Sequence, residues 1–538
     1  MANGETVVPV EYGADVFVEV LNANGVEYLF INSGTDTFPI QEAMAKFIAQ
    51  GKPVPRAILC PDESTAIAAA HGHFMVTRRP QVVLVHVDAG TMQLGGGMHN
   101  SQRGRAGIVL CAGRAPTTFD GELDGTRSMN IHWIQEQSDQ AGMLRNFTKW
   151  DYELRRKENI QHVMQRAFQL ASSEPCGPVY VTLPREVLME PLIEVKVPDV
   201  DRYGPVTTPQ ADPAGIKEAA EALANSRNPL IITGQSGRNP STVEAMTRLA
   251  ELIGAPVVSE PVHMNFPSTH PMWAGISAQP YLDEADVILA VDQDVPYVPS
   301  LGRPRPDARI IQIDIDPVKS TIPMWVFPTD LLLHADTSKA IPALVEAVEE
   351  AMTEADRARA MERFQVIEGR HQRQRESAVK LAESHASRPS ITPEWLSHCI
   401  GEVIGEDTVL LDECVTNSAT VASYVRRSQP GTYYKSGGSS LGWALGGGHW
   451  GPRLARSLPS PSERWQQRWA TGHSSTGVPR PRSGPRTPTM RLSSRLSITT
   501  SFTTPSNGRS RPATRTATPT GPTTGLAWSS ALRSISPC

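Results

Sequence analysis

The sequence has few cysteines, and they form no pattern that would bind a metal or build a disulfide framework. Six cysteines are scattered over 538 residues, with no CxxC pair and no histidines at zinc-binding spacing. Scattered cysteines of this kind are typical of reduced thiols in the cytoplasm. We therefore expect a cytoplasmic protein without a cysteine-based metal site.

Two further absences limit the partners of the chain. No apolar run reaches the roughly 18 residues of a membrane-spanning helix, and the amino terminus lacks the basic start and apolar core of a signal peptide. The net charge of −5 gives no overall basic character for binding nucleic acid. The sequence thus predicts neither membrane nor nucleic-acid binding.

Acidic residues are nearly absent from the end of the chain. Residues 449–538 contain 13 arginines, no lysine, no aspartate and one acid, Glu463, which leaves a net charge of −17 on residues 1–448. Pro, Ser, Thr and Arg dominate this segment, and no period of 2 or 3.6 residues persists. We expect residues 449–538 to be an aberrant, low-complexity and disordered tail.

The preceding residues have the pattern of an α/β protein. In residues 10–190, short apolar runs such as 81–87 indicate strands buried on both faces, and segments such as 63–77 indicate helices. Residues 205–350 repeat this alternation after a proline-rich linker. Strands that alternate with helices predict parallel sheets covered on both sides.

A third unit begins but does not continue. A charged helical connector leads to residues 390–448, which contain a predicted helix, one strand and a glycine-rich segment. A single strand must bury its faces against something, and the tail after residue 448 offers little apolar material. We therefore expect this third unit to be truncated.

Two residues of the first unit could carry chemistry. Glu63 opens a predicted helix, where a carboxylate can simply complement the helix dipole. His86 ends an apolar run at the carboxyl end of a predicted parallel strand, where ligands bind. It could carry protons near neutral pH, or it could be a satisfied core histidine.

Several segments together resemble the pyrimidine-binding domain of thiamin-diphosphate-dependent enzymes, in the branch of acetolactate synthase and benzoylformate decarboxylase. They are Pro61–Ala66, Ala69–Gly72, His86–Thr91, Asn100–Arg103 and Leu110–Gly113. Residues 205–350 resemble the central Rossmann-like domain of that family, and residues 412–413 with 437–445 resemble the start of its pyrophosphate-binding domain. The resemblance implies three doubly wound parallel-sheet domains, the third truncated after about residue 448.

The resemblance also implies roles for individual residues. Glu63 matches the glutamate that binds N1′ of the aminopyrimidine and favours the imino tautomer, whose nitrogen takes the proton from thiazolium C2. His86 matches a proton-relaying histidine of the decarboxylases. Thr35 lies where a serine contacts substrate carboxylate, and Gln93 lies near a residue of the same pocket. The remaining cofactor-binding candidates are Glu413, Ser439 and Leu441, of which Leu441 matches the apolar residue under the thiazolium.

The metal site of the family has no counterpart in the sequence as written. The family binds the diphosphate through Mg²⁺, with oxygen ligands from Gly-Asp-Gly and a later Asn. Residues 449–538 contain no Asp, so no metal ligand is assigned. We shifted the reading frame so that each new codon starts at the third base of a codon of the sequence as written. In this frame the bases of Trp469 and Ala470 must encode Gly, and the next two codons can encode Asp and Gly. We therefore expect a lost reading frame near codons 445–450.

The predicted function is that of a thiamin-diphosphate-dependent lyase or carboligase acting on small 2-oxo acids, similar to acetolactate synthase and impaired as written. A benzoylformate-type decarboxylase is the first alternative. An inactive fragment that only pairs with intact subunits is the second, and a nucleotide-binding regulator built on Thr233–Gly237 is a third. The family implies a homodimer or homotetramer, and FAD binding stays open.

Overall fold

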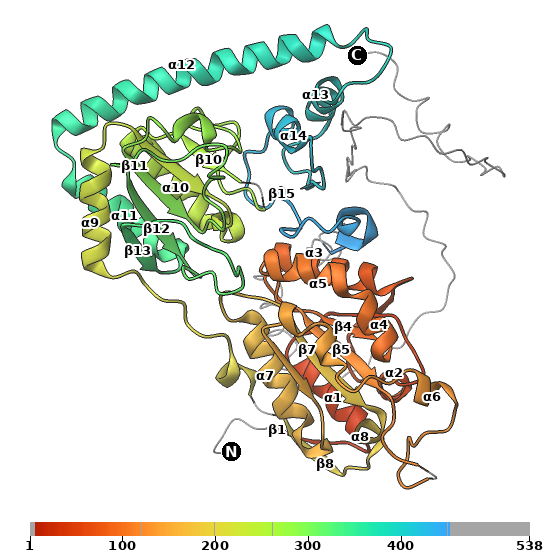
Figure 1. Cartoon of the computed structure of the whole chain (residues 1–538). Coiled ribbons are helices and arrows are strands. Elements are labelled where there is room, and N and C mark those ends of the chain that lie inside the picture. The colour runs from red at the N-terminus through yellow and green to blue at the C-terminus, as the bar shows by residue number, and fades with distance from the viewer. Residues whose placement is uncertain (1–5, 120, 198, 261, 449, 452–538) are drawn as a thin grey trace, which may run out of the picture. The chain divides into compact units, whose positions relative to one another are not determined.

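The computed structural model describes residues 6–119, 121–197, 199–260, 262–448 and 450–451 (Figure 1). Apart from residues 450–451, the predicted low-complexity tail lies outside the described residues, as does the region expected to replace the metal motif. The described part is an α/β protein with two large parallel sheets, which confirms the predicted fold class.

The first sheet has six parallel strands in the order β3-β2-β4-β5-β7-β6. Every residue of β2 and β4 is buried, as a sheet covered by helices on both faces requires. The strands are β2 (Tyr28–Ile31), β3 (Arg56–Leu59), β4 (Val82–Val85), β5 (Val109–Arg114), β6 (Trp150–Glu153) and β7 (Val179–Pro184).

Helices cover both faces of this sheet (Figure 1). They are α1 (Gly13–Ala23), α2 (Phe38–Ala49), α3 (Glu63–Thr77), α4 (Val87–Gln93), α5 (Gly95–Arg103), α6 (Ile131–Ile134), α7 (Ile160–Ser172) and α8 (Arg185–Met189). Side chains alternate across the sheet, so Val82 and Leu84 pack with α1, α2 and α7, whereas Val83 and Val85 pack with α3 and α5.

Helix α3 has the bounds that the sequence predicts. It begins after Asp62, whose carboxylate accepts a hydrogen bond from Thr65 N at 2.9 Å, and it ends at Arg78 in the left-handed region at φ 58°. The small side chains of Ala66 and Ala70 are fully buried, so neighbouring elements approach this helix closely. The capped start of α3 fixes the position of Glu63 in its first turn.

Some strands are absent from the sequence prediction. The edge strand β6 alternates aromatic and acidic residues and is only half-buried, so it lacks the continuous apolar run that marks the interior strands. Strands β1 (Thr6–Pro9) and β8 (Glu194–Val197) pair antiparallel in a separate two-stranded sheet. This pairing joins segments almost 190 residues apart, which no local pattern indicates.

The second sheet has five parallel strands in the order β10-β9-β11-β12-β13. They are β9 (Pro229–Thr233), β10 (Val257–Ser259), β11 (Val287–Val291), β12 (Arg309–Asp314) and β13 (Leu331–His334). Helices α9 (Pro213–Asn225), α10 (Pro240–Ile253) and α11 (Thr337–Ala351) share one apolar core with the strands.

The third part is small. Helix α12 (Glu354–Ser384) is the predicted charged connector, and it begins with a capping box between Thr353 and Asp356. Strands β14 (Leu410–Leu411) and β15 (Tyr433–Tyr434) form a parallel pair. The other elements are α13 (Pro393–Val403), α14 (Ser418–Tyr424) and the short π-helix η7 (Ala444–Gly448).

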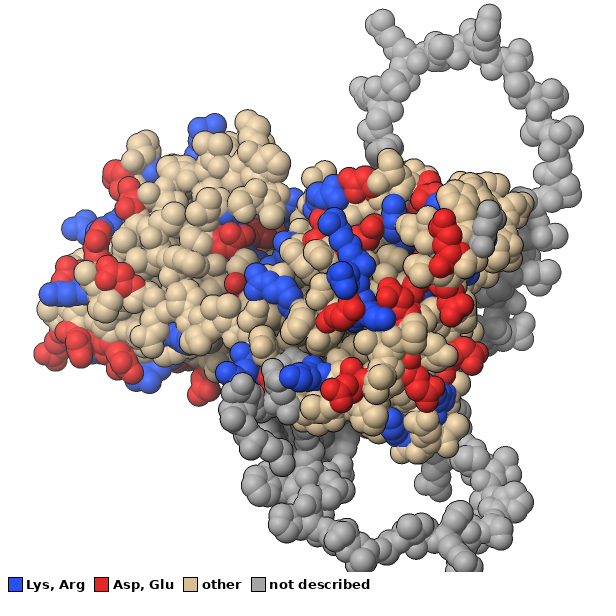
Figure 2. Space-filling view, turned by 90° about the horizontal axis from the view of Figure 1, so that it is seen from below, with Lys and Arg blue, Asp and Glu red and all other residues tan. Residues whose placement is uncertain are grey.

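Surface and helix composition give two further findings. None of the described helices is both long and apolar enough to cross a membrane. The face drawn in Figure 2 carries Lys and Arg interspersed with Asp and Glu.

Replacing Asp62 with alanine should destabilise the protein by about 1 kcal/mol, because the first turn of α3 loses its side-chain acceptor. Urea unfolding followed by circular dichroism would measure this change. Asp62→Asn keeps a capping oxygen and should lose less than half as much. An alanine variant as stable as the parent would show that the cap does not hold α3.

Candidate active site

The strand order of the first sheet creates a crevice between β2 and β4. The chain leaves β2 to form β3 on one side, whereas β4 lies on the other side. The loops that leave β2 and β4 therefore diverge, and such a switch point at the carboxyl ends of parallel strands is where ligands bind. Thr35 and Asp36 follow β2, and His86 follows β4.

Glu63 presents an unengaged carboxylate at this edge. Its side chain is buried, at 9% exposure, and no residue in the described part of the chain donates a hydrogen bond to it. A β-carbon built on Gly90 would lie 2.9 Å from Glu63 Oε1, so this glycine keeps the space beside the oxygen open. A carboxylate without a donor from the described residues fits a ligand that brings an N–H, as the aminopyrimidine ring of thiamin diphosphate would.

Helix α4 connects Glu63 with His86. His86 is the N-cap residue of α4, and its carbonyl accepts a hydrogen bond from Gly90 N at 2.7 Å. The turn that begins at His86 thus brings Gly90 against Glu63. The two catalytic residues predicted from the sequence border the same short helix.

His86 is held at both ring nitrogens. Nδ1 donates to Asp36 Oδ1, and Nε2 lies 3.0 Å from Gln135 Oε1. The second oxygen of Asp36 accepts a hydrogen bond from Val87 N at 3.2 Å. His86 is therefore not an ordinary core histidine, since its side chain is 23% exposed and oriented by a buried carboxylate.

A small pocket lies beside His86. It leaves about 10 Å³ free, room for about one water molecule. Thr35 is exposed and lines this pocket, and its carbonyl accepts a hydrogen bond from Arg185 Nη1 at 3.3 Å. Gln93 lies at the end of α4, is exposed and is not part of the pocket lining, so its role stays a prediction.

The pKa values of the two histidines at the pocket are shifted in opposite directions. The hydrogen bond to Asp36 raises the pKa of His86, against the lowering effect of burial. Burial lowers the pKa of His132, and the nearby charges of Arg185 and Arg127 lower it further. The surroundings thus favour the protonated form of His86 and the neutral form of His132.

Glu413 has a different setting. It follows β14, and its carboxylate accepts hydrogen bonds from Trp443 N at 2.6 Å and Ala444 N at 3.4 Å. Burial raises its pKa. The side chain therefore ties β14 to the start of η7, and its predicted contact with the cofactor stays a prediction.

The glycine-rich segment contacts α5. The Asn100 amide donates to Ser440 O at 2.9 Å and accepts from Ser440 N at 2.9 Å. A β-carbon on Gly96 would lie 2.5 Å from Ser440 Oγ, so the glycines of α5 permit this close approach. Ser439 is exposed at φ 61° and Leu441 is 65% exposed, and both stay candidate cofactor contacts.

The diphosphate side of the site does not match the family in the described residues. No group of three or more His, Cys, Asp or Glu side chains that could hold a metal occurs in that part of the chain. Glu63 therefore fits the aminopyrimidine side of the cofactor, and the described residues offer no such metal-binding group.

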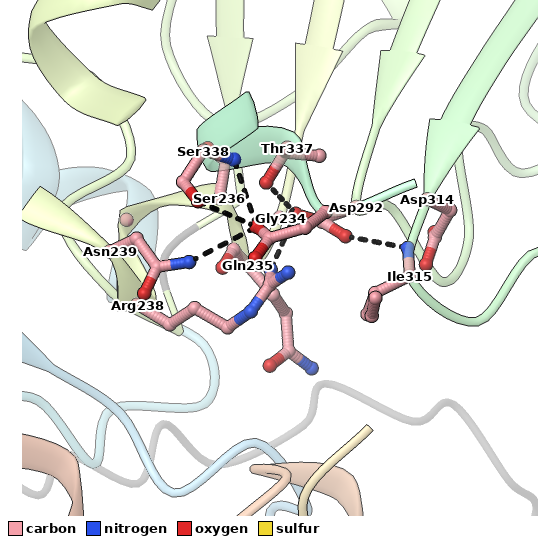
Figure 3. Close-up of polar contacts among 12 residues, drawn as sticks. Gly234, Gln235, Ser236, Arg238, Asn239, Asp292, Asp314, Ile315, Thr337 and Ser338 are labelled. Carbon is pink, nitrogen blue, oxygen red and sulfur yellow. Dashed lines mark hydrogen bonds and ion pairs between the residues drawn. The ribbon is translucent and has the colours of Figure 1, made fainter. Parts of the chain in front are cut away.

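The second sheet has a switch point of its own, between β9 and β11. Here Asp292, with 0% exposure, accepts hydrogen bonds from Arg238, Thr337 and the backbone of Ile315 (Figure 3). A β-carbon on Gly234 would lie 2.4 Å from Gln293 Oε1. Gly234 thus serves close packing, and not every polar group at this edge is paired, since the side-chain oxygens of Gln235 and Gln293 are buried without a hydrogen bond.

Replacing Glu413 with alanine should cost about 1–3 kcal/mol, since two backbone N–H groups at the start of η7 lose their acceptor. Glu413→Gln keeps one acceptor oxygen and should cost about half as much. Urea denaturation at pH 7 compares the two variants. Equal stability of both variants and the parent would contradict a structural role for this carboxylate.

Two parts of the chain match known families. Residues 12–143 match the thiamine pyrophosphate enzyme N-terminal TPP binding domain, and residues 216–344 match the thiamine pyrophosphate enzyme central domain. The chain is 25% identical to an acetolactate synthase of Mycobacterium bovis over 454 residues, 80% of this chain and 68% of that protein. It is 22% identical to a benzoylformate decarboxylase of Pseudomonas aeruginosa over 447 residues, covering 79% and 75%.

Other matches are shorter or concern the fold alone. A probable acetolactate synthase large subunit of Methanocaldococcus jannaschii is 26% identical over 328 residues, and the chain spans about half (51%) of its length. The benzoylformate decarboxylase structure from Polynucleobacter necessarius has a TM-score of 0.65 at 20% identity, covering 85% of this chain and 79% of that chain. Residues 12–143 and 216–344 therefore match the N-terminal and central domains of thiamine pyrophosphate enzymes, which confirms the resemblance of these two segments. The assignment of residues 412–413 and 437–445 to a pyrophosphate-binding domain stays a prediction.

Proposed function

We propose that this chain is a thiamin-diphosphate-dependent lyase or carboligase for small 2-oxo acids, of the acetolactate synthase type. The observation that carries the proposal is Glu63, a buried carboxylate with a free acceptor oxygen in a family-matched cofactor-binding domain. The synthases among the relatives, at 25–26% identity, support the choice of type.

The cofactor, when bound, supplies a nucleophilic carbon that adds to the 2-oxo group and accepts the electrons released with carbon dioxide. Glu63 would accept the hydrogen bond of the aminopyrimidine N1′. His86 would hold or move a proton at Nε2. Thr35 would contact the substrate carboxylate, and Leu441 would lie under the thiazolium.

A benzoylformate-type decarboxylase is the second candidate. His86 favours it, because a proton donor beside the pocket can protonate the product in place of a second carbonyl compound. We propose further that the active form is a homodimer or homotetramer in the cytoplasm. FAD binding is left open.

Activity of the chain as written is a separate question. We propose that residues 449–538 reflect a lost reading frame and that the chain is impaired without it, because no Asp is available there for Mg²⁺. A chain of this kind could still contribute Glu63 to a site shared with an intact subunit.

The DNA around codons 445–450 tests the frame. We expect independent sequencing to reveal a one- or two-base difference that restores Gly-Asp-Gly near residues 469–472. A confirmed frame as written would refute this part of the proposal and would leave an impaired chain as the natural product.

Cofactor titration tests the function. The frame-restored protein should bind thiamin diphosphate saturably and only with Mg²⁺, and it should release carbon dioxide from pyruvate or an aryl 2-oxo acid. Glu63→Gln should lower this rate by about 10²–10⁴-fold, since the neutral amide cannot favour a protonated N1′ as the carboxylate does. Glu42→Gln, an exposed residue of α2, is the matched control and should change nothing. Full activity of Glu63→Gln would overturn the proposal.

A further inference from the structure

Asp36 is a buried carboxylate that sequence reasoning did not single out. It is 3% exposed, and both of its oxygens are engaged, Oδ1 by His86 Nδ1 and Oδ2 by Val87 N. An acid in a Gly-Thr-Asp-Thr turn is usually a local cap. Here its partners lie 50 and 51 residues away, directly after β4, so it joins the segments that leave β2 and β4.

Two glycines leave space for the side chains of Asp36 and His86. A β-carbon on Gly34 would lie 1.9 Å from His86 Nδ1, and one on Gly113 would lie 1.6 Å from Asp36 Oδ2. Gly34 follows β2 and Gly113 belongs to β5, so two strands leave room for the pair where any other residue would collide with it.

Val87, next to His86, has a strained backbone conformation. Its φ of 26° is unusual for a β-branched residue, and such conformations cost about 1–3 kcal/mol and occur at functional sites. The strained residue directs its N–H at Asp36, and its carbonyl accepts a hydrogen bond from Thr91 Oγ1 at 2.6 Å. The protein thus holds a strained residue where it meets the Asp36 carboxylate.

The contacts define how His86 can act. Asp36 accepts from Nδ1 and can only accept when ionised, so the ring keeps its proton there and turns Nε2 toward Gln135. This is the geometry in which a carboxylate orients a histidine and stabilises its protonated form. Asp88 adds a smaller favourable charge. The other charged or titratable groups that line the pocket are Arg114, His132 and Arg185.

We propose that Asp36 is a positioning residue, which keeps the proton on Nδ1, fixes the orientation of His86 and favours its protonated form, so that Nε2 can exchange a proton with the substrate. The inference rests on the proposed function for its chemical meaning. The pairing of Asp36 with His86 can be tested without cofactor or turnover. The positioning role and the proposed function can therefore be refuted independently.

The test is a titration of the histidine side chains by NMR. The full chain is labelled with ¹³C and ¹⁵N in histidine, and His86→Gln identifies the signal. In the parent protein, we expect the pKa of His86 to lie above the ordinary value, with Nδ1 protonated throughout. Asp36→Asn should lower that pKa by about one unit, a tenfold loss of proton affinity.

Asp88→Asn is the matched control. It removes the same charge two residues from His86, from a side chain that bonds Ala89 N and Gln137 instead of the imidazole. It should shift the pKa of His86 by clearly less than Asp36→Asn does. Gly113→Ala keeps the charge but displaces the carboxylate, and it should also lower the pKa.

Two results would overturn the proposal. One is a parent His86 with a pKa at or below the ordinary value or with its proton on Nε2 alone, which needs no variant to fold. The other is a folded Asp36→Asn protein in which His86 titrates as in the parent. If the pairing is confirmed but the frame-restored protein binds no thiamin diphosphate, the proposed function fails and the pairing stands.

Discussion

Parallel pairing of the strands is the constraint on which both large sheets depend. It places every carboxyl end on one edge, and each switch in strand order separates two loops at that edge. Backbone and side-chain polar groups gather there, and they bond to one another, to water or to a ligand.

At the β9–β11 switch point, the completely buried Asp292 accepts hydrogen bonds from Arg238, Thr337 and a backbone N–H (Figure 3). The side-chain oxygens of Gln235 and Gln293 are buried there without a hydrogen bond. At the β2–β4 switch point, both oxygens of Asp36 and both ring nitrogens of His86 are engaged, and no described residue donates to the Glu63 carboxylate. Unused acceptors therefore occur at both edges, and the carboxylate–histidine pair distinguishes the first.

The sequence predicts the interior of the fold better than its edges. Continuous apolar runs predict β9 and β11 with the observed bounds, because a strand buried on both faces needs such a run. The half-exposed strand β6 is missed because its pattern resembles a loop. Glu63 and His86 are candidates because each lies at a recognisable helix start or strand end and matches a residue of the family that the sequence resembles. Asp36 is missed because its role depends on a contact across the sheet and on the backbone of Val87, neither of which is visible locally.

Positions 34 and 113, beside the Asp36–His86 pair, leave no room for a side chain, whereas other positions around His86 carry one. Residues 129–135 border the pocket beside His86 through Ile131, His132 and Gln135, and their neighbours Met129 and Ile134 are 40% and 68% exposed. In natural divergence and in laboratory libraries aimed at new substrates, the accepted substitutions should therefore occur within residues 129–135. Positions 34 and 113 should remain glycine in every functional descendant.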